Sequence, residues 1–107
     1  MLSKNKTTDL HLLCKDYKFI NRSTNEKFTS GYWYFSLERA SSLIGANIYF
    51  HNTKSELSYT GGIITKVEQQ KYNEQDRIVF TFEFNQKNID KSWQGDTNPR
   101  AWYSIVK

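Results

Sequence analysis

Short runs of alternating hydrophobic and polar residues recur along the chain and predict β-strands. The clearest run covers residues 77–85, where Ile78, Phe80, Phe82 and Phe84 alternate with Val, Thr and Glu. A period of two places alternate side chains on opposite faces of a strand. Similar runs of apolar and β-favouring residues predict five further strands, at residues 10–14, 31–35, 46–51, 62–68 and 101–106.

One segment has helical spacing instead. Ser36 is a favourable N-cap residue, and the apolar positions that follow, at 37, 40, 43 and 44, fall on one helical face. Gly45 comes next, at the position where a left-handed residue commonly ends a helix. We therefore expect one short helix over about residues 36–45.

Six strands and one helix indicate a mainly β (α+β) protein, built as a small, strongly bent sheet or barrel with the helix packed on it. The length of 107 residues fits a single domain over residues 1–107. Residues 1–9 are polar, and we expect a frayed N-terminal tail there. Residues 18–30 are interpreted as a polar connection, and residues 86–100 as a long polar loop.

The Gly61-Gly62 pair stands between a polar loop and the strand at 62–68. Glycine inside a strand pattern has two common explanations. Either another group approaches the backbone closely, or the strand contains a bulge. The sequence leaves both open.

Charge and cysteine content restrict the possible partners. The net charge is 15 − 11 = +4, which weakly favours an anionic partner. Cys14 is the only cysteine, which fits a reducing compartment and suggests a cytoplasmic protein. No apolar stretch approaches the roughly 18 residues of a membrane span, so we expect no membrane partner.

Catalytic or metal chemistry has little support. The only histidines, His11 and His51, fall in different predicted strands, with no acid at motif spacing. Together with Cys14 they would give an incomplete zinc site of unfamiliar spacing. No glycine-rich phosphate loop is present. We therefore expect a protein that is not an enzyme and uses no metal or cofactor.

Binding has better candidates. Residues 92–100 combine Trp93 with turn-forming and hydrogen-bonding residues and end at Arg100, so this loop is either a binding element or a surface loop held by one indole. His51 ends a strand, and it either hydrogen-bonds a ligand in a pocket or is an outward-facing strand residue. Tyr59 precedes the diglycine. Three lysines in the loops could contact phosphates: Lys54, Lys87 and Lys91.

The order of these elements resembles the PUA-like superfamily, in particular its EVE and ASCH branches, over about residues 31–84. The similar parts are the ring-rich strand 32–35, the strand 48–51 that ends in His, and the glycine-led strand 61–67. The resemblance implies a curved barrel whose pocket holds a base, often modified and flipped out of its strand. Transferred by position, it implies pocket residues Trp33, Ser36, His51, Asn52, Trp93 and Trp102.

Two hypotheses about function follow. The first is a non-catalytic nucleic-acid or nucleotide-binding module that recognises a base, such as a modified RNA base, in an aromatic pocket. The second is a small protein–protein interaction module, for example a regulator or inhibitor encoded by a phage or mobile element. Interface centres favour Tyr and Trp, in which this chain is rich.

Overall fold

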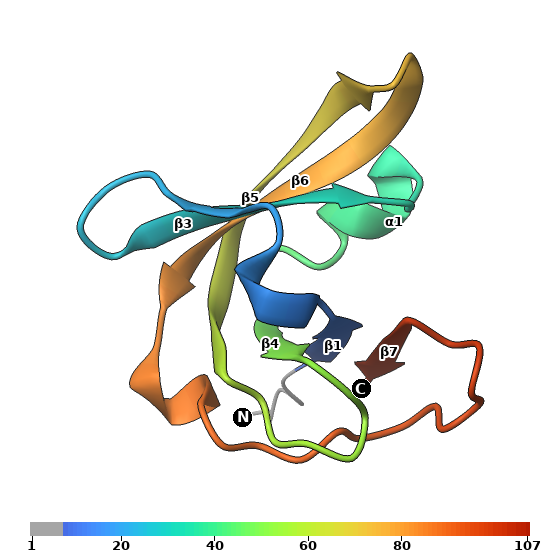
Figure 1. Ribbon diagram of the computed structural model, residues 1–107. Helices are drawn as coiled ribbons and strands as arrows, with labels where there is room; N and C mark the ends of the chain where they lie inside the picture. The colour runs from blue at the N-terminus through green and yellow to red at the C-terminus, as the bar shows by residue number, and fades with distance from the viewer. Residues whose placement is uncertain (1–7) are drawn as a thin grey trace, which may run out of the picture.

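The computed structural model describes residues 8–107, which form a seven-stranded sheet with one short α-helix (Figure 1). The mainly β class is thus confirmed. The elements in chain order are β1 (Asp9–Leu13), the 3₁₀ turn η1 (Lys15–Tyr17), β2 (Ile20–Arg22), β3 (Lys27–Trp33), α1 (Leu37–Ser41), β4 (Asn47–His51), β5 (Thr60–Tyr72), β6 (Gln75–Phe84), the 3₁₀ turn η2 (Gln86–Asn88) and β7 (Tyr103–Val106).

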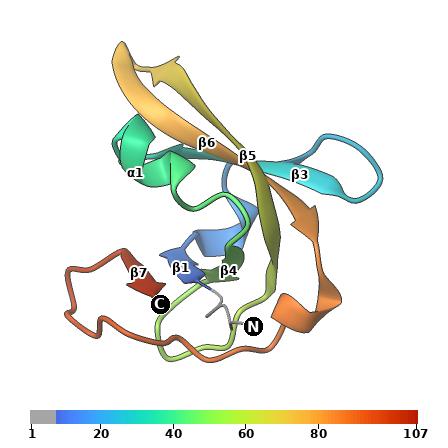
Figure 2. The same cartoon turned by 180° about the vertical axis from the view of Figure 1, so that it is seen from behind.

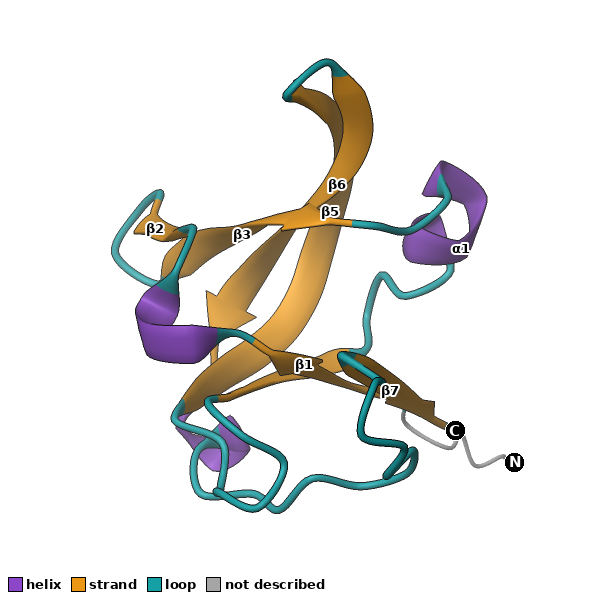
Figure 3. Ribbon diagram, turned by 45° about the vertical axis from the view of Figure 1, so that its right-hand side comes forward, coloured by secondary structure: helices purple, strands orange, loops and turns teal. Residues whose placement is uncertain are grey.

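The sheet is mixed and open. Its strand order is β2-β3-β6-β5-β4-β1-β7, with β1 and β4 parallel and the other neighbours antiparallel. The long strands β5 and β6 connect an upper half that contains β3 with a lower half that contains β1, β4 and β7 (Figures 1 and 2). The edge strands β2 and β7 are not paired with each other, so the sheet does not close into a barrel (Figure 3).

The hydrophobic core lies between these two halves. Ile78, Phe80 and Phe82 of β6 are all buried, as their alternation predicts. The Phe82 ring contacts that of Phe50 from β4, with centroids 5.2 Å apart. The other buried hydrophobic residues of this cluster are Leu10, Leu12, Cys14, Ala40, Leu43, Ala46, Ile48 and Ile64.

The prediction of a polar connection at residues 18–30 is wrong. This segment contains β2 and most of β3, which pair antiparallel with Arg22 opposite Phe28. Strand β2 has only three residues, of which Ile20 alone is apolar, so no alternation marks it as a strand. Strand β3 ends at Trp33, two residues before the predicted boundary.

Strand β5 is almost twice as long as the sequence predicts. Its second half carries mostly polar side chains exposed beyond the core, so a hydrophobic pattern cannot reveal it. The hairpin to β6 turns at Asn73 and Glu74, which both have positive φ values, of 51° and 65°. Two consecutive positive φ values match the twist of a tight β-hairpin.

Helix α1 begins where the sequence predicts and ends earlier. The Ser36 hydroxyl accepts a hydrogen bond from the Arg39 backbone N–H at 3.1 Å, the N-cap contact expected there. The α-helix stops at Ser41, and the following turn reaches Gly45, whose φ is +93°.

The two adjacent glycines are explained by close approach of the backbone. A Cβ on Gly61 would lie 2.2 Å from the Ile48 carbonyl oxygen, and one on Gly62 would lie 1.9 Å from that of Glu83. The neighbouring groups are therefore strands β4 and β6 of the sheet itself. The register shift in β5 comes later, between Ile64 and residue 66.

Most of the predicted N-terminal tail, residues 1–7, lies outside the described residues, and β1 begins at Asp9. Within residues 8–107, no helix has the length and apolar character needed to span a membrane.

Candidate functional site

The predicted site residues fall into several separate places. Trp33 and Trp102 lie together, with nearly parallel rings whose centroids are 5.7 Å apart. The Trp33 indole N–H donates to Ser30 Oγ at 2.9 Å. Phe35 packs edge-on against Trp102. These rings are partly buried and pack against the hydrophobic core.

His51 belongs to a different cluster, which is buried. His51 Nε2 lies 2.9 Å from His11 Nδ1, and His51 Nδ1 lies 3.0 Å from the Glu56 carbonyl oxygen. Both imidazoles are almost fully buried. The outward-facing interpretation of His51 is therefore wrong. Trp93 packs over both imidazoles, with centroids 5.6 Å from His11 and 5.3 Å from His51.

The hydrogen bonds assign the protons of this pair. A carbonyl oxygen only accepts, so neutral His51 carries its proton on Nδ1 and presents a lone pair on Nε2. His11 must then donate from Nδ1, which leaves an unprotonated Nε2. That atom is buried and has no hydrogen-bond partner among residues 8–107.

Burial keeps both imidazoles neutral. Loss of solvent, and to a lesser degree the proximity of His51, lowers the pKa of His11 to about 4. Burial also lowers the pKa of His51, although its hydrogen bond to Glu56 opposes this effect. Two neutral imidazoles under an indole form a packed structural cluster.

The remaining predicted polar residues mostly hold the chain together. Asn52 Oδ1 accepts from the Asp16 backbone N–H at 2.9 Å. The Tyr59 hydroxyl donates to the Cys14 carbonyl, and burial raises the pKa of this phenol. Lys54 donates to the Asn98 carbonyl, and its ammonium lies 5.5 Å from the centre of the Trp93 ring.

Several predicted residues are exposed or line a separate hollow. Arg100 is exposed at the end of the long loop, where its backbone N–H donates to Asn98 Oδ1. Lys87 and Lys91 are also exposed. Ser36 lines a shallow hollow of about 260 Å³ beside α1, together with Tyr34 and Phe35. The structure therefore does not bring the predicted set together in one cavity.

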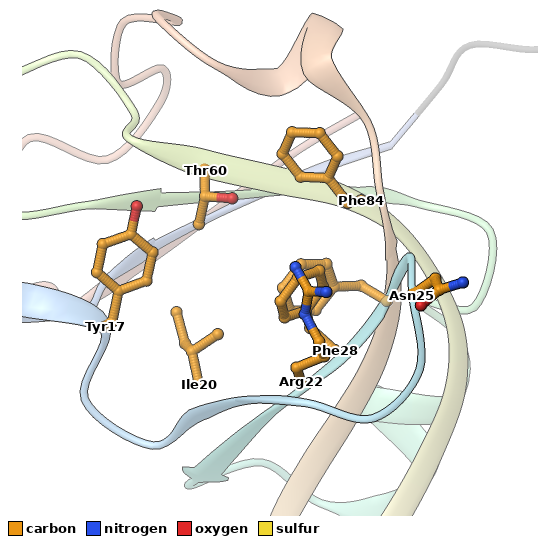
Figure 4. Close-up of a pocket in the computed structure, with 8 residues that line it drawn as sticks. Tyr17, Ile20, Arg22, Asn25, Phe28, Thr60 and Phe84 are labelled. Carbon is orange, nitrogen blue, oxygen red and sulfur yellow. The ribbon is translucent and has the colours of Figure 1, made fainter.

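A different hollow, which sequence reasoning missed, has the character of a binding pocket. It lies between the β2–β3 hairpin, the ends of β5 and β6, and η1, and its volume is about 320 Å³ (Figure 4). We call it the β2 pocket. Its lining residues are Tyr17, Ile20, Arg22, Asn25, Phe28, Thr60, Phe82 and Phe84.

Aromatic rings form much of the β2 pocket. Phe28 and Phe82 are stacked, with centroids 5.7 Å apart and an interplanar angle of 20°. Tyr17 packs against Tyr59 at 4.6 Å and is 56% exposed. Phe84 is 37% exposed, so a ligand can reach its ring.

Polar groups of the β2 pocket are available for a ligand. The Arg22 guanidinium lies 5.4 Å from the centre of the Phe28 ring and has no acidic partner among residues 8–107. Figure 4 shows Tyr17 and Ile20 on one side of the hollow and Arg22 and Phe28 on the other. A cation, an amide and a hydroxyl thus stand beside flat apolar faces, the combination that small-molecule sites use.

A signal for this pocket was present in the sequence but weak. Ile20, Arg22 and Phe28 belong to the hairpin that the sequence analysis interpreted as a connection. Phe84 continues the alternating face of β6 beyond the buried core. Only the pairing of β2 with β3 brings these positions together.

Metal and redox chemistry have no assembled site in the part of the chain that is described. No group of three or more His, Cys, Asp or Glu side chains is arranged there to hold a metal ion. Cys14 is a free, buried thiol, and burial raises its pKa. A raised pKa reduces the thiolate fraction and hence the reactivity.

Comparison of the chain with protein-family models, curated proteins and solved structures gives no significant match. The resemblance to the PUA-like superfamily therefore stays a prediction.

Proposed function

We propose that this protein is a non-catalytic module that binds a nucleotide or single-stranded nucleic acid by holding a base in the β2 pocket. The observation that carries the proposal is the hollow itself: stacked and exposed rings beside an arginine that has no acidic partner among residues 8–107. The β2 pocket takes the place of the pocket that the sequence predicted around His51 and Trp93, because these two side chains pack against each other.

The chemistry of the lining fits a base and a phosphate. A base removed from its strand needs flat apolar faces and a few hydrogen-bonding groups for its edge. Tyr17 and Phe84 offer exposed rings, while Asn25 and Thr60 offer donors and acceptors. Arg22 can bind a phosphate oxygen or stack on a base.

The local charge supports an anionic ligand. Residues 14–28, which form one wall of the β2 pocket and its approach, contain four basic residues (Lys15, Lys18, Arg22 and Lys27) and two acidic ones. Phosphate binding depends on such cations and weakens as salt increases. This excess is modest, and it favours a short ligand over a long duplex.

We propose no catalytic step at this site. The residues that line the β2 pocket include no His, Cys, Asp or Glu, which are the side chains most often used for proton transfer and nucleophilic attack. The PUA-like relationship, recognition of a modified base and a cytoplasmic location belong to the same proposal. The open aromatic hollow is consistent with recognition of a base, and the free Cys14 thiol is consistent with a cytoplasmic location.

The test is a binding titration at low salt. Fluorescein-labelled single-stranded RNA and DNA, with and without a modified base, would be followed by anisotropy, and mononucleotides by calorimetry. We expect Tyr17→Ala and Arg22→Ala each to weaken binding by about 5- to 100-fold, the effect of losing one stacking or phosphate contact. Binding should also weaken with increasing salt.

A matched control pair lies elsewhere on the surface. Tyr34 is 73% exposed, and the Arg77 guanidinium lies 4.8 Å from the centre of its ring. Tyr34→Ala and Arg77→Ala remove the same chemical groups without touching the β2 pocket, so they should leave binding unchanged. Failure of every nucleotide to bind, or equal losses in both pairs, would overturn the proposal.

A pull-down from host lysate treated with nuclease distinguishes nucleotide binding from the alternative, a protein–protein interaction module. A partner protein that is retained in stoichiometric amount after nuclease treatment, together with no binding in the titration, would favour that alternative.

A further inference from the structure

Strand β7 is an edge of the sheet with an open side. Among residues 8–107 it pairs with β1 alone, in a register that places His11 opposite Ser104 and Leu12 opposite Tyr103. The Leu13 backbone N–H donates to the Trp102 carbonyl at 3.0 Å, in the same register. In an antiparallel pair, hydrogen-bonded and non-hydrogen-bonded positions alternate.

This alternation fixes which backbone groups of β7 point outward. Because Leu13 and Trp102 form a hydrogen-bonded pair, so do His11 and Ser104 two residues further along. Tyr103 and Ile105 are then the non-hydrogen-bonded positions. Their N–H and C=O groups point away from β1, and among residues 8–107 no other strand lies on that side.

A slot runs along this open edge. Its volume is about 290 Å³, and we call it the β7 slot. Its lining residues are Arg39, Gly95, Asp96, Ala101, Tyr103, Ser104 and Ile105. Three consecutive residues of one strand line it although their side chains alternate between faces, so the slot follows the strand edge.

The residues that line the β7 slot include one cation, Arg39, and one carboxylate, Asp96. The Asp96 backbone N–H donates to Ser104 Oγ at 2.9 Å, which holds the loop on the face where Ser104 points. The Arg39 guanidinium lies 5.5 Å from the centre of the Tyr103 ring, on the opposite face. Arg39 and Asp96 form no ion pair with each other.

We propose that the β7 slot binds an extended peptide segment of a partner protein as an added strand. The outward groups of Tyr103 and Ile105 supply a ladder of backbone hydrogen bonds, which is how β-augmentation gives affinity. Side chains of the added strand alternate between the two faces of the sheet. An acidic residue facing Arg39, followed by a basic residue facing Asp96, matches the charges.

The shape of the slot favours a peptide over a second copy of this chain. The loop stands on one face of β7 and α1 on the other. A second copy pairing through its own β7 would bring its own loop and its own α1 to the same edge. A single extended peptide has no such flanking elements. The β7 slot lies at the opposite edge of the sheet from the β2 pocket, so this proposal is independent of nucleotide binding.

The experiment uses a short labelled peptide of Thr and Val with one Glu-Lys pair at its centre. Its matched control is the same peptide N-methylated at alternate amides, which cannot form the ladder. We expect the plain peptide to bind and the methylated peptide to bind at least about tenfold more weakly, the effect of roughly one lost hydrogen bond. Arg39→Gln should weaken binding of the Glu-containing peptide and leave that of an all-Thr/Val peptide unchanged.

Two variants test the backbone contact directly. Proline is tolerated at an edge position whose N–H points outward, so Ile105→Pro should fold yet fail to bind. Ile105→Ala, which keeps the N–H, should still bind. Amide hydrogen exchange gives a second measurement: Tyr103 and Ile105 should exchange faster than Ser104 in the free protein and slow down when peptide is added.

Three results would overturn the proposal. One is equal binding of the plain and methylated peptides. Another is slow exchange of the Tyr103 and Ile105 amides in the free chain at every protein concentration, which would mean that the edge is already covered. The third is slowing of these amides with protein concentration alone, which would identify a second copy as the occupant.

Discussion

Lowering the pH from 7.5 to 5 should destabilise this protein because its two buried imidazoles have lowered pKa values, and the contribution of His11 can be isolated. The folded protein holds the pKa of His11 at about 4, against 6.5 for an unperturbed histidine. Between these values the unfolded chain binds a proton that the folded chain does not. The stability that neutral His11 contributes is therefore present above pH 6.5, and it is lost progressively as the pH falls toward 4.

The size of the effect follows from the two pKa values. Linkage gives a loss of about 2 kcal/mol at pH 5 and about 3 kcal/mol at pH 4 from His11 alone. The structural reason is that a proton on Nε2 would charge a site closed by Tyr49 and Trp93, whose ring centroids lie 4.6 Å and 5.6 Å from that of His11. The charged atom would have no acceptor among residues 8–107.

The assay is urea unfolding followed by Trp emission at a series of pH values. Other groups also titrate in this range, so the informative quantity is the difference between wild type and His11→Gln. Glutamine keeps a hydrogen-bond donor for His51 but does not titrate. We expect wild type to lose about 2 kcal/mol more than the variant between pH 7.5 and pH 5. Equal losses in the two proteins would refute the assignment of the neutral, unpartnered imidazole to His11.

Three further predictions concern single side chains. Gly62→Ala should cost at least about 3 kcal/mol of unfolding free energy, because the new Cβ would lie 1.9 Å from the Glu83 carbonyl oxygen. The control variant Gly45→Ala should cost only about 1–2 kcal/mol, because the new Cβ would meet open space and only the positive φ would be strained. Asn88→Ala should cost about 2 kcal/mol in urea unfolding, since this buried amide donates to two strand carbonyls at 2.8 and 3.2 Å; a loss below about 0.5 kcal/mol would contradict the role. Cys14 should react with a disulfide reagent at pH 8 at least about 100-fold more slowly in the native protein than in urea, and rapid native labelling would show that the thiol is accessible.

The parts of the fold that the sequence predicted are those in which one face of an element is buried. Strand β6 is the best case, because Ile78, Phe80 and Phe82 all face the core. Helix α1 has a cap that the sequence identifies, Ser36. By contrast, β2 and the second half of β5 bury little, and hydrogen bonds to a neighbouring strand hold them in place. Such pairing depends on distant residues and leaves no local pattern.

The candidate site was harder to predict for the same reason. His51 and Trp93 were candidates for a pocket because polar or aromatic residues at loop boundaries often bind ligands. The sequence contained no sign that His11 would lie 2.9 Å from His51 and share its burial under Trp93. Trp33 and Trp102, both predicted to line a pocket, stack on one another at the edge of the core.

The position of the β2 pocket follows from the length of β6 relative to the core. Along one face of this strand, Phe80 and Phe82 are almost fully buried, whereas Phe84 is 37% exposed. The same row of rings thus passes from the interior to the surface at the end of the strand, and the rings of Phe28 and Tyr17 surround the point of exit. Because β2 and β7 stay unpaired with each other, one edge leaves aromatic faces open and the other leaves backbone groups open, and the two proposed activities each use one of these edges.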